Sequence, residues 1–239
     1  MKPLRLLFPK SVKSPPDFEP EAVAIGERVR PFTMTSPERI YAVIQAVNHI
    51  VRAGIPGDLV ECGVWRGGSS MAAALTLLGR GVTDRDLHLF DTFEGMPAPG
   101  PEDRTFSGEN PRERWNRQRR SGQGSAWSSV PLEDVRRNVT GTGYPASRLH
   151  FIKGMVETTI PEKAPDKIAL LRLDTDWYAS TKHELDHLFP RLARGGVLII
   201  DDYGHWEGAR KAVDEYFTAH DVKMLLARVD YTARMGVTP

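Results

Sequence analysis

Apolar positions follow two patterns along the chain, one typical of buried strands and one typical of helices. Short apolar runs, typical of strands buried on both faces, cover residues 59–62, 87–90, 149–152, 168–173 and 197–200. Between them, apolar residues recur at helical spacing over residues 69–78, 132–139, 180–189 and 208–219. Strand followed by helix, repeated, is typical of an α/β fold with a doubly wound, mostly parallel sheet.

A helix that precedes the first strand has clear start and stop signals. Ser36 is suited to cap its N-terminus and Pro37 to occupy its first turn, and apolar residues follow at three-and-four spacing from Ile40. Gly54 ends the pattern. We therefore expect the main domain to cover residues 36–239.

Residues 1–35 contain six prolines and show little periodicity. We expect this segment to be an arm that lies over the surface of the domain or of a neighbouring subunit. Because such an arm has little reason to be ordered alone, it favours a homodimer or a higher homo-oligomer.

The connection from Asp91 to the helix at Leu132 is far longer than the roughly 2–6 residues usual in α/β folds. Loops of this length are functional lids or disordered segments. This one leaves the binding edge of the sheet and carries Trp115 and Trp127, which favours a lid over residues 97–130.

The overall charge is nearly balanced. Across 239 residues, Lys and Arg number 32 and Asp and Glu 31, which gives a net charge of +1. This balance argues against a nucleic-acid binder or a polybasic membrane protein. Five arginines between positions 112 and 120 are typical of a solvated face, with recognition of a phosphate as the alternative.

Cysteine usage and apolar run lengths favour a cytoplasmic protein. Cys62 is the single cysteine, so the chain can form neither an intramolecular disulfide nor a cysteine-rich zinc site. Arg5 and Pro9 interrupt the N-terminal apolar patch well short of a signal-peptide core. No apolar run approaches the roughly 20 residues of a spanning helix, so we expect no membrane insertion.

Ligands of doubly wound sheets bind beyond the carboxyl ends of the strands. The first predicted strand runs into the glycine-rich turn at residues 61–68, whose backbone can approach a ligand closely. Trp65 stands where the dinucleotide fingerprint has its second glycine, and Asp91 lies further from Gly63 than the usual ~20 residues. A cofactor without a pyrophosphate fits better, and an ordinary strand-to-helix turn is the alternative.

The second predicted strand ends at Asp91 and Thr92. A carboxylate at this position can accept both hydroxyls of a ribose. Capping of the next segment is the alternative role.

Paired acids follow the last two predicted strands. Asp174 and Asp176 come after the fourth, and Asp201 and Asp202 after the fifth. Carboxylates gathered at one sheet edge repel one another unless a cation lies among them, and hard oxygen ligands suit Mg²⁺, Mn²⁺ or Ca²⁺. The pattern predicts a divalent cation site, with a helix-capping network as the alternative.

Five sequence runs, taken together, are specific to one family. They read TSPER, ECGVWRGG, FDTFEGM, DTDWY and IDDY and begin at residues 35, 61, 90, 174 and 200. In this order they resemble the macrocin, mycinamicin and novobiocin sugar O-methyltransferases, a branch of the class I S-adenosylmethionine-dependent methyltransferases. The resemblance implies a seven-stranded, Rossmann-like sheet and a Mg²⁺-dependent transfer to a hydroxyl of a sugar or glycosylated natural product.

The resemblance also implies roles for single residues. It makes Asp174, Asp201 and Asp202 the metal ligands and Asp176 the general base, with His205 as a second candidate for base or substrate contact. Together with the strand-end turns, it places eight residues at the cofactor: Glu61, Gly63, Trp65, Ser69, Asp91, Thr92, Gly154 and Met155.

Two other functions are compatible with parts of the pattern. Asp174 and Asp176 resemble the acid pair of Mg²⁺-dependent phosphohydrolases, although that pair normally follows the first strand. A non-catalytic cofactor-binding module is the other, and the presence of all four aspartates disfavours it. An antibiotic sugar, a glycolipid sugar and a nucleotide-linked sugar all remain open as acceptor.

Overall fold

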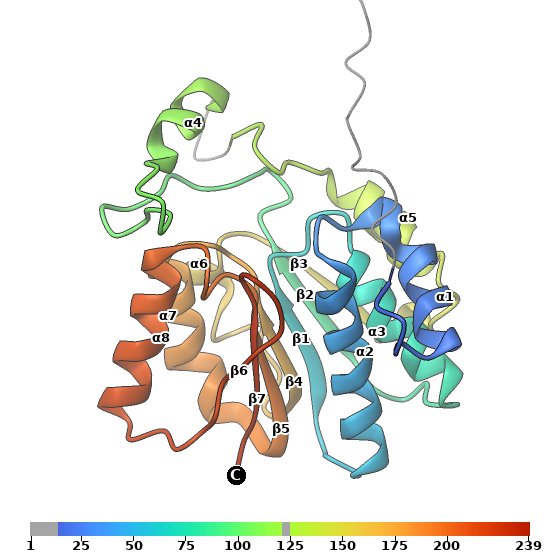
Figure 1. The fold of residues 1–239 in the computed structure, drawn as a ribbon. Helices are drawn as coiled ribbons and strands as arrows, with labels where there is room; N and C mark the ends of the chain where they lie inside the picture. Colours follow the sequence, from blue (N-terminus) through green and yellow to red (C-terminus); the bar gives the residue numbers. More distant parts are fainter. Residues whose placement is uncertain (1–13, 121–124) are drawn as a thin grey trace, which may run out of the picture.

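The computed structural model describes residues 14–120 and 125–239 (Figure 1). Within them lies a seven-stranded sheet in the order β3-β2-β1-β4-β5-β7-β6. The first five strands are parallel, and β7 runs antiparallel to β5 and β6. The strands are β1 Asp58–Cys62, β2 Leu87–Asp91, β3 Leu149–Lys153, β4 Ile168–Leu173, β5 Leu192–Ile200, β6 Ala227–Arg228 and β7 Arg234–Val237. The predicted fold class is confirmed.

Helices cover both faces of the sheet and enclose two apolar cores. One face is covered by α1 Pro20–Val29, α2 Pro37–Arg52, α3 Gly68–Gly79 and α5 Leu132–Thr140. The other is covered by α6 Val156–Thr159, α7 Tyr178–Leu188 and α8 Glu207–Ala219. Three single-turn 3₁₀ helices occur at Arg30–Phe32, Ala146–Arg148 and Phe189–Arg191.

The N-terminal segment differs from the irregular arm expected from its prolines. Helix α1 packs on α2 and α3 of the same chain, and Ala22, Ile25 and Val29 are buried in the core. The prolines hid this helix because Pro20 occupies its first turn, where a missing N–H costs nothing. Residues 1–13 of the predicted arm lie outside the described residues.

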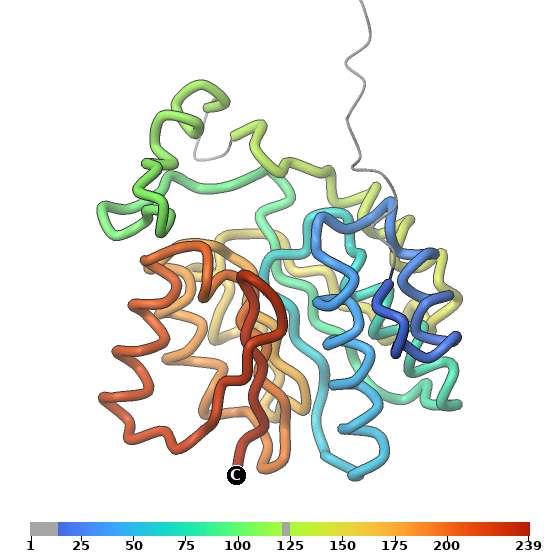
Figure 2. The backbone as a smooth tube through the Cα atoms, viewed as in Figure 1, coloured from blue at the N-terminus to red at the C-terminus, as the bar shows by residue number. Residues whose placement is uncertain are grey.

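The described parts of the lid, residues 97–120 and 125–130, extend over the carboxyl edge of the sheet (Figure 2). The lid contains helix α4, Pro111–Gln118. The sequence predicts no helix in this segment, because the segment has no apolar periodicity. Asn110 caps this helix by accepting a hydrogen bond from the backbone N–H of Arg112 (2.9 Å). Residues 121–124, in the Gly/Ser-rich part of the lid, lie outside the described residues.

Gly63 explains how β1 and β4 come together at their carboxyl ends. Its φ is +84°, and a Cβ at this position would lie 1.9 Å from the backbone oxygen of Asp174. A residue with a side chain would therefore force the two strand ends apart. The glycine lets the turn after β1 and the acids after β4 share one edge.

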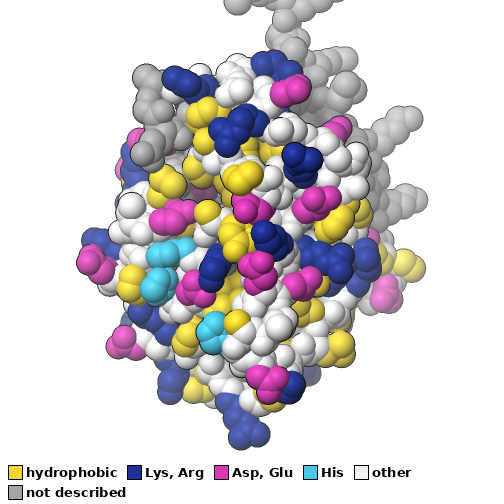
Figure 3. All heavy atoms as spheres, turned by 90° about the vertical axis from the view of Figure 1, so that its left-hand side faces the viewer, with side chains coloured by type: hydrophobic (Ala, Val, Ile, Leu, Met, Phe, Trp, Pro, Cys, Tyr) yellow, Lys and Arg dark blue, Asp and Glu magenta, His cyan; other side chains and the backbone are white. Residues whose placement is uncertain are grey.

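The face formed by α7 and α8 carries interspersed charges (Figure 3). Acidic and basic side chains alternate across it, and several form pairs within one helix, such as Lys182 with Asp186 (3.0 Å). In the part of the chain that the structure describes, no helix combines the length and apolar character needed to cross a membrane.

Candidate active site

Three acids converge where β4 and β5 end. Each of Asp174, Asp201 and Asp202 offers a carboxylate oxygen, and these atoms lie within 4.8 Å of one another. Burial raises the pKa of Asp174 and of Asp202 well above the usual range, and the neighbouring carboxylates raise it further. The structure thus brings together the three predicted ligands, and their binding of a metal stays a prediction.

Arg172 lies buried in the centre of this acidic group. It stands opposite Glu61 in the register of β4 and β1, and its Nη1 is 2.6 Å from Oε1 of Glu61. Its Nη2 lies 2.7 Å from carboxylate oxygens of both Asp174 and Asp201. A charged residue in an otherwise apolar strand was visible in the sequence, but its partners depend on strand order and register.

Arg39 is a second guanidinium that motif spacing did not assign to the site. It projects from the first turn of α2, contacts the Asp201 carboxylate through Nη1, and has Nε 3.1 Å from Oδ2 of Asp230. The Ser36 hydroxyl donates to the same Asp230 oxygen (2.8 Å). Asp201 is therefore held between two arginines from opposite sides.

The charges of the site leave room for a divalent cation. Its carboxylates belong to Glu61, Asp174, Asp176, Asp201 and Asp202. Among the described residues of the cluster, the guanidiniums of Arg39 and Arg172 balance two of these five. Carboxyl oxygens are hard donors, which fit Mg²⁺, Mn²⁺ or Ca²⁺ rather than zinc.

Asp176 lies beside the three-acid group and does not belong to it. Its backbone is left-handed, with φ +66°, and its N–H donates to Oδ2 of Asp202 (3.2 Å). Its own Oδ1 accepts from the indole N–H of Trp206 (2.5 Å). Burial and the negative charge of Asp174 raise the pKa of Asp176 to about 7, which suits a group that takes up a proton near neutrality.

His205 is half-buried at the mouth of the site. Its Nδ1 lies 3.2 Å from the hydroxyl of Tyr231. Burial lowers the pKa of His205, and the charge of Arg39 acts in the same direction. This shift favours the neutral imidazole, and the role of His205 in proton transfer or substrate contact stays a prediction.

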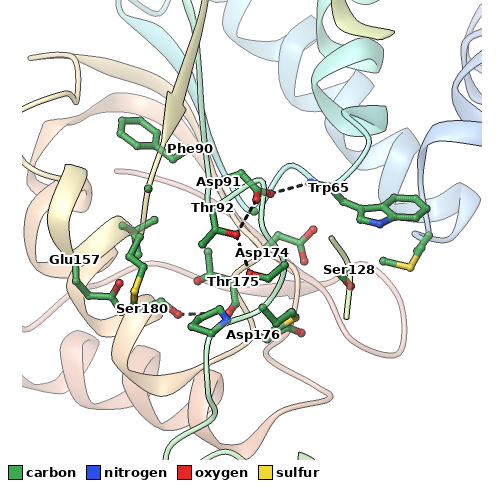
Figure 4. A pocket seen from close by; sticks show the side chains of 18 residues that line it. Trp65, Phe90, Asp91, Thr92, Ser128, Glu157, Asp174, Thr175, Asp176 and Ser180 are labelled. Atoms are coloured by element: carbon green, nitrogen blue, oxygen red, sulfur yellow. Dashed lines mark hydrogen bonds between the residues drawn. The ribbon is translucent and has the colours of Figure 1, made fainter. Parts of the chain in front are cut away.

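A first cavity opens beside the turn after β1 (Figure 4). Six of the predicted cofactor residues line it, namely Gly63, Trp65, Asp91, Thr92, Gly154 and Met155. The Asp91 carboxylate accepts from the backbone N–H groups of Val64 (2.7 Å), Trp65 (3.0 Å) and Phe93 (2.7 Å), so it also fixes both turns around the cavity. Its predicted ribose contact is untested.

Glu61 and Ser69 occupy a different place from the other predicted cofactor residues. Both line a second cavity of about 370 Å³. The Glu61 carboxylate is held by Arg172 and by the hydroxyl of Ser70, which draws it toward the acidic group. Their direct contact with a cofactor stays a prediction.

The second cavity adjoins the first at Asp174 and Asp176, which line both. Besides the acidic group and the turn after β1, its walls include three segments far apart in the sequence: residues 32–35, the lid, and residues 231–232. Of the lid arginines, Arg114 reaches this cavity, with its guanidinium 4.0 Å from the ring centroid of Trp127. Two reactants bound in the two cavities would meet beside Asp176.

The sheet order, the glycine turn and the cavity at the ends of β1 and β2 define a class I methyltransferase fold. Residues 11–235 match the macrocin O-methyltransferase family, TylF, and the chain belongs to this family. The resemblance seen in the sequence runs is confirmed, and the protein is an O-methyltransferase.

The relatives are enzymes that modify natural products. The chain is 34% identical to the 8-demethyl-8-(2,3-dimethoxy-alpha-L-rhamnosyl)-tetracenomycin-C 4'-O-methyltransferase of Streptomyces olivaceus, over 91% of this chain and 79% of the relative. It is 32% identical to the mycinamicin III 3''-O-methyltransferase of Micromonospora griseorubida, over 86% and 76%. The structure of the O-methyltransferase NovP superposes with a TM-score of 0.76 at 31% identity and covers 87% of this chain and 82% of that one.

Proposed function

We propose that this O-methyltransferase uses S-adenosylmethionine and Mg²⁺ to methylate a sugar hydroxyl of a glycosylated natural product. The observation that carries the proposal is the meeting of two cavities at Asp176, next to the acidic group formed by Asp174, Asp201 and Asp202. The names of the relatives support a sugar-bearing acceptor.

The first cavity suits S-adenosylmethionine. Trp65 closes the position where a dinucleotide fold admits a pyrophosphate, and Asp91 faces the cavity with a carboxylate that can still accept ribose hydroxyls (Figure 4). Gly154 and Met155 also line it, and the family resemblance places them next to the adenine. The residues present therefore fit a nucleoside that carries a methionine chain.

The acidic group suits Mg²⁺, which Asp174, Asp201 and Asp202 would hold. When bound, the ion would lower the pKa of a sugar hydroxyl and fix its direction. Arg39 and Arg172 hold the Asp201 carboxylate in place. Lid residues line the second cavity, where they would limit the access of water to the reacting groups.

Asp176 supplies the base in this proposal. The hydroxyl oxygen forms a bond to the methyl carbon, the carbon–sulfur bond breaks, and its electron pair stays on sulfur as a thioether. The hydroxyl proton passes to the Asp176 carboxylate. A positioned base contributes about 10²–10⁴-fold to such a step.

Methyl transfer from isotopically labelled S-adenosylmethionine tests the proposal. The acceptors are 4-nitrophenyl α-L-rhamnoside, a rhamnosylated polyketide, a macrolide glycoside and dTDP-rhamnose, with mass spectrometry of the products. We expect labelled product from at least one glycoside, loss of product with EDTA and recovery with Mg²⁺. Absence of S-adenosylmethionine binding in calorimetry would contradict the cofactor assignment, and full turnover in EDTA would contradict the metal.

The base assignment has its own test. Asp176→Asn should lower kcat by about 10²–10⁴-fold and leave the Kd for S-adenosylmethionine unchanged, because the amide keeps the size of the side chain and loses the proton acceptor. His205→Gln is the matched comparison at the other candidate base. Unchanged kcat in Asp176→Asn together with loss in His205→Gln would move the base to His205.

A further inference from the structure

Four tryptophans form a buried cluster between the lid and the domain. Trp115 and Trp127 belong to the lid, whereas Trp177 and Trp206 belong to the loops after β4 and β5. All four are at most 8% exposed. The rings of Trp177 and Trp206 meet edge to face at 4.9 Å, and Trp127 packs against both, at 5.8 and 6.4 Å. The cluster therefore joins the lid to the loops that carry the acids.

Three indole N–H groups of the cluster have different acceptors. Trp115 donates to the backbone oxygen of Met96 (3.0 Å) and Trp177 to that of Pro97 (3.1 Å), so both act on the base of the lid. Trp206 donates to the carboxylate of Asp176 (2.5 Å). Of the three, Trp206 is the one whose indole N–H contacts the candidate base.

The backbone and the lid hold the Trp206 ring in place. The backbone N–H of Trp206 donates to the backbone oxygen of Asp202 (3.0 Å). An antiparallel bridge pairs it with Thr105 of the lid, and Glu207 donates to the backbone oxygen of Arg104 (2.8 Å). The direction of the indole N–H is thus set by the β5 loop and the lid together.

Asp176 needs such a partner because of where it lies. Its left-handed backbone, with φ +66°, places the carboxylate between the first and the second cavity, two residues from Asp174. Its side chain also lies within hydrogen-bonding reach of the Asp202 carboxyl, one of the predicted cation ligands. A fixed indole donor on one oxygen limits how far the carboxylate can rotate in this position.

We propose that Trp206 is a positioning residue, whose indole N–H fixes the orientation of the Asp176 carboxylate where the first and the second cavity share their walls. The role of Trp206 in the reaction rests on the proposed function. The hydrogen bond from Trp206 to Asp176 is observed independently of it. The residue acts through Asp176 and need not touch the acceptor's reacting atom.

Trp206→Phe tests the proposal, because phenylalanine keeps an aromatic ring in the cluster and removes the donor. We expect kcat to fall by about 10- to 100-fold, the cost of a misplaced catalytic group, with KM for the acceptor and Kd for S-adenosylmethionine unchanged. Trp115→Phe is the matched control. It removes one indole N–H from the same cluster, but Met96 keeps the hydrogen bond from the Ser125 hydroxyl (3.1 Å), so kcat should stay within about 2-fold.

A crystal structure of Trp206→Phe gives a readout that is independent of turnover. We expect the Asp176 carboxylate in a different rotamer, with the backbone of residues 174–177 unmoved. If the variant does not fold, replacement of Trp206 by benzothienylalanine keeps the ring size and puts sulfur in place of the N–H, and the same loss of kcat is expected.

Two results would overturn the proposal: equal kcat values in Trp206→Phe and Trp115→Phe, or an unmoved carboxylate in the Trp206→Phe structure. A third outcome separates the two proposals. If the wild type transfers no methyl group but the Asp176 carboxylate changes rotamer in Trp206→Phe, the proposed function is refuted and the positioning role of Trp206 is retained.

Discussion

Arg172 shows how the site combines a structural and a chemical task in one residue. It is 4% exposed, and its guanidinium holds carboxylates from β1, β4 and β5. Burial of an ion is costly unless partners surround it, and removal of one partner leaves the others uncompensated. Arg172 therefore allows the sheet to bring three acidic strand ends to one edge.

Replacement of Arg172 by methionine should be strongly destabilising. Three carboxylates would lose their buried countercharge, so we expect the free energy of unfolding to fall by about 3–5 kcal/mol in urea denaturation monitored by circular dichroism. Arg117→Gln is the matched control, because Arg117 pairs with Glu113 on the exposed surface of α4 (4.0 Å) and should change stability by less than about 1 kcal/mol. Similar effects of the two substitutions would refute the central role of Arg172.

At the scale of elements, the lid is anchored by a helix cap. Asp103 of the lid is 2% exposed, and its carboxylate accepts from the backbone N–H of Tyr178, the first residue of α7 (2.8 Å). The residue at the N-cap of α7, Trp177, has a side chain that can only donate, so it cannot serve this N–H. The lid thus completes a helix of the domain that it covers.

Asp103→Ala should destabilise the protein and loosen the lid together. The lost cap is expected to cost about 0.5–2 kcal/mol, and limited proteolysis should cut the lid sooner than in the wild type. Asn110→Ala removes the cap of α4 within the lid itself and serves as the control. If Asn110→Ala accelerated cleavage at the lid base as much as Asp103→Ala, the cap of α7 would not be the anchor.

The elements differ in how far their sequence predicts them. The five parallel strands and helices α3, α5, α7 and α8 carry clear apolar patterns and lie close to the expected bounds, except that β5 begins five residues before the predicted run at 197–200. Helices α4 and α6, of eight and four residues, were not predicted. Helix α1 is hard to predict because it lies in a proline-rich segment with little periodicity. The resemblance implies seven strands, but the residues of β6 and β7 cannot be assigned because strands of two and four residues carry too little pattern.

The site divides in the same way. Acids at strand ends are predictable because parallel strands deliver their carboxyl ends to one edge. The contacts of Arg39 with Asp201 and of Trp206 with Asp176 join residues 162 and 30 positions apart, so no local spacing reveals them. Arg172 could be singled out as a charge in an apolar strand, but only the strand register supplies Glu61 as its partner.

For the whole molecule, the acidic site makes stability depend on pH. Burial raises the pKa of Asp174, Asp176 and Asp202 above the roughly 3.9 of an unfolded aspartate. Each such group stabilises the fold fully below about pH 3.9, and this contribution is lost as the pH rises through the folded value, about 7 for Asp176. In the cation-free protein, Asp176→Asn should remove the part of this pH-dependent loss of stability that comes from Asp176.

We therefore expect the Tm of EDTA-treated wild type to fall relative to Asp176→Asn as the pH rises from about 4 to about 8 in scanning fluorimetry. Mg²⁺ should raise the Tm of the wild type at pH 8, and much less at pH 4, where the carboxyl groups carry protons. A wild-type Tm that ignores Mg²⁺ at pH 8 would argue against a cation at this edge. Parallel curves for the two proteins across the range would contradict the buried charge at Asp176.

The close approach at Gly63 has a consequence for how this family diversifies. Because the turn after β1 lies directly against the backbone of Asp174, the spacing between this turn and the acids after β4 is fixed by main chain rather than by exchangeable side chains. The outer walls of the second cavity come instead from residues 32–35, the lid and residues 231–232. In the proposed reaction, substitutions in these walls would change which sugar is accepted, while the distance between the methyl donor and the acceptor would stay the same.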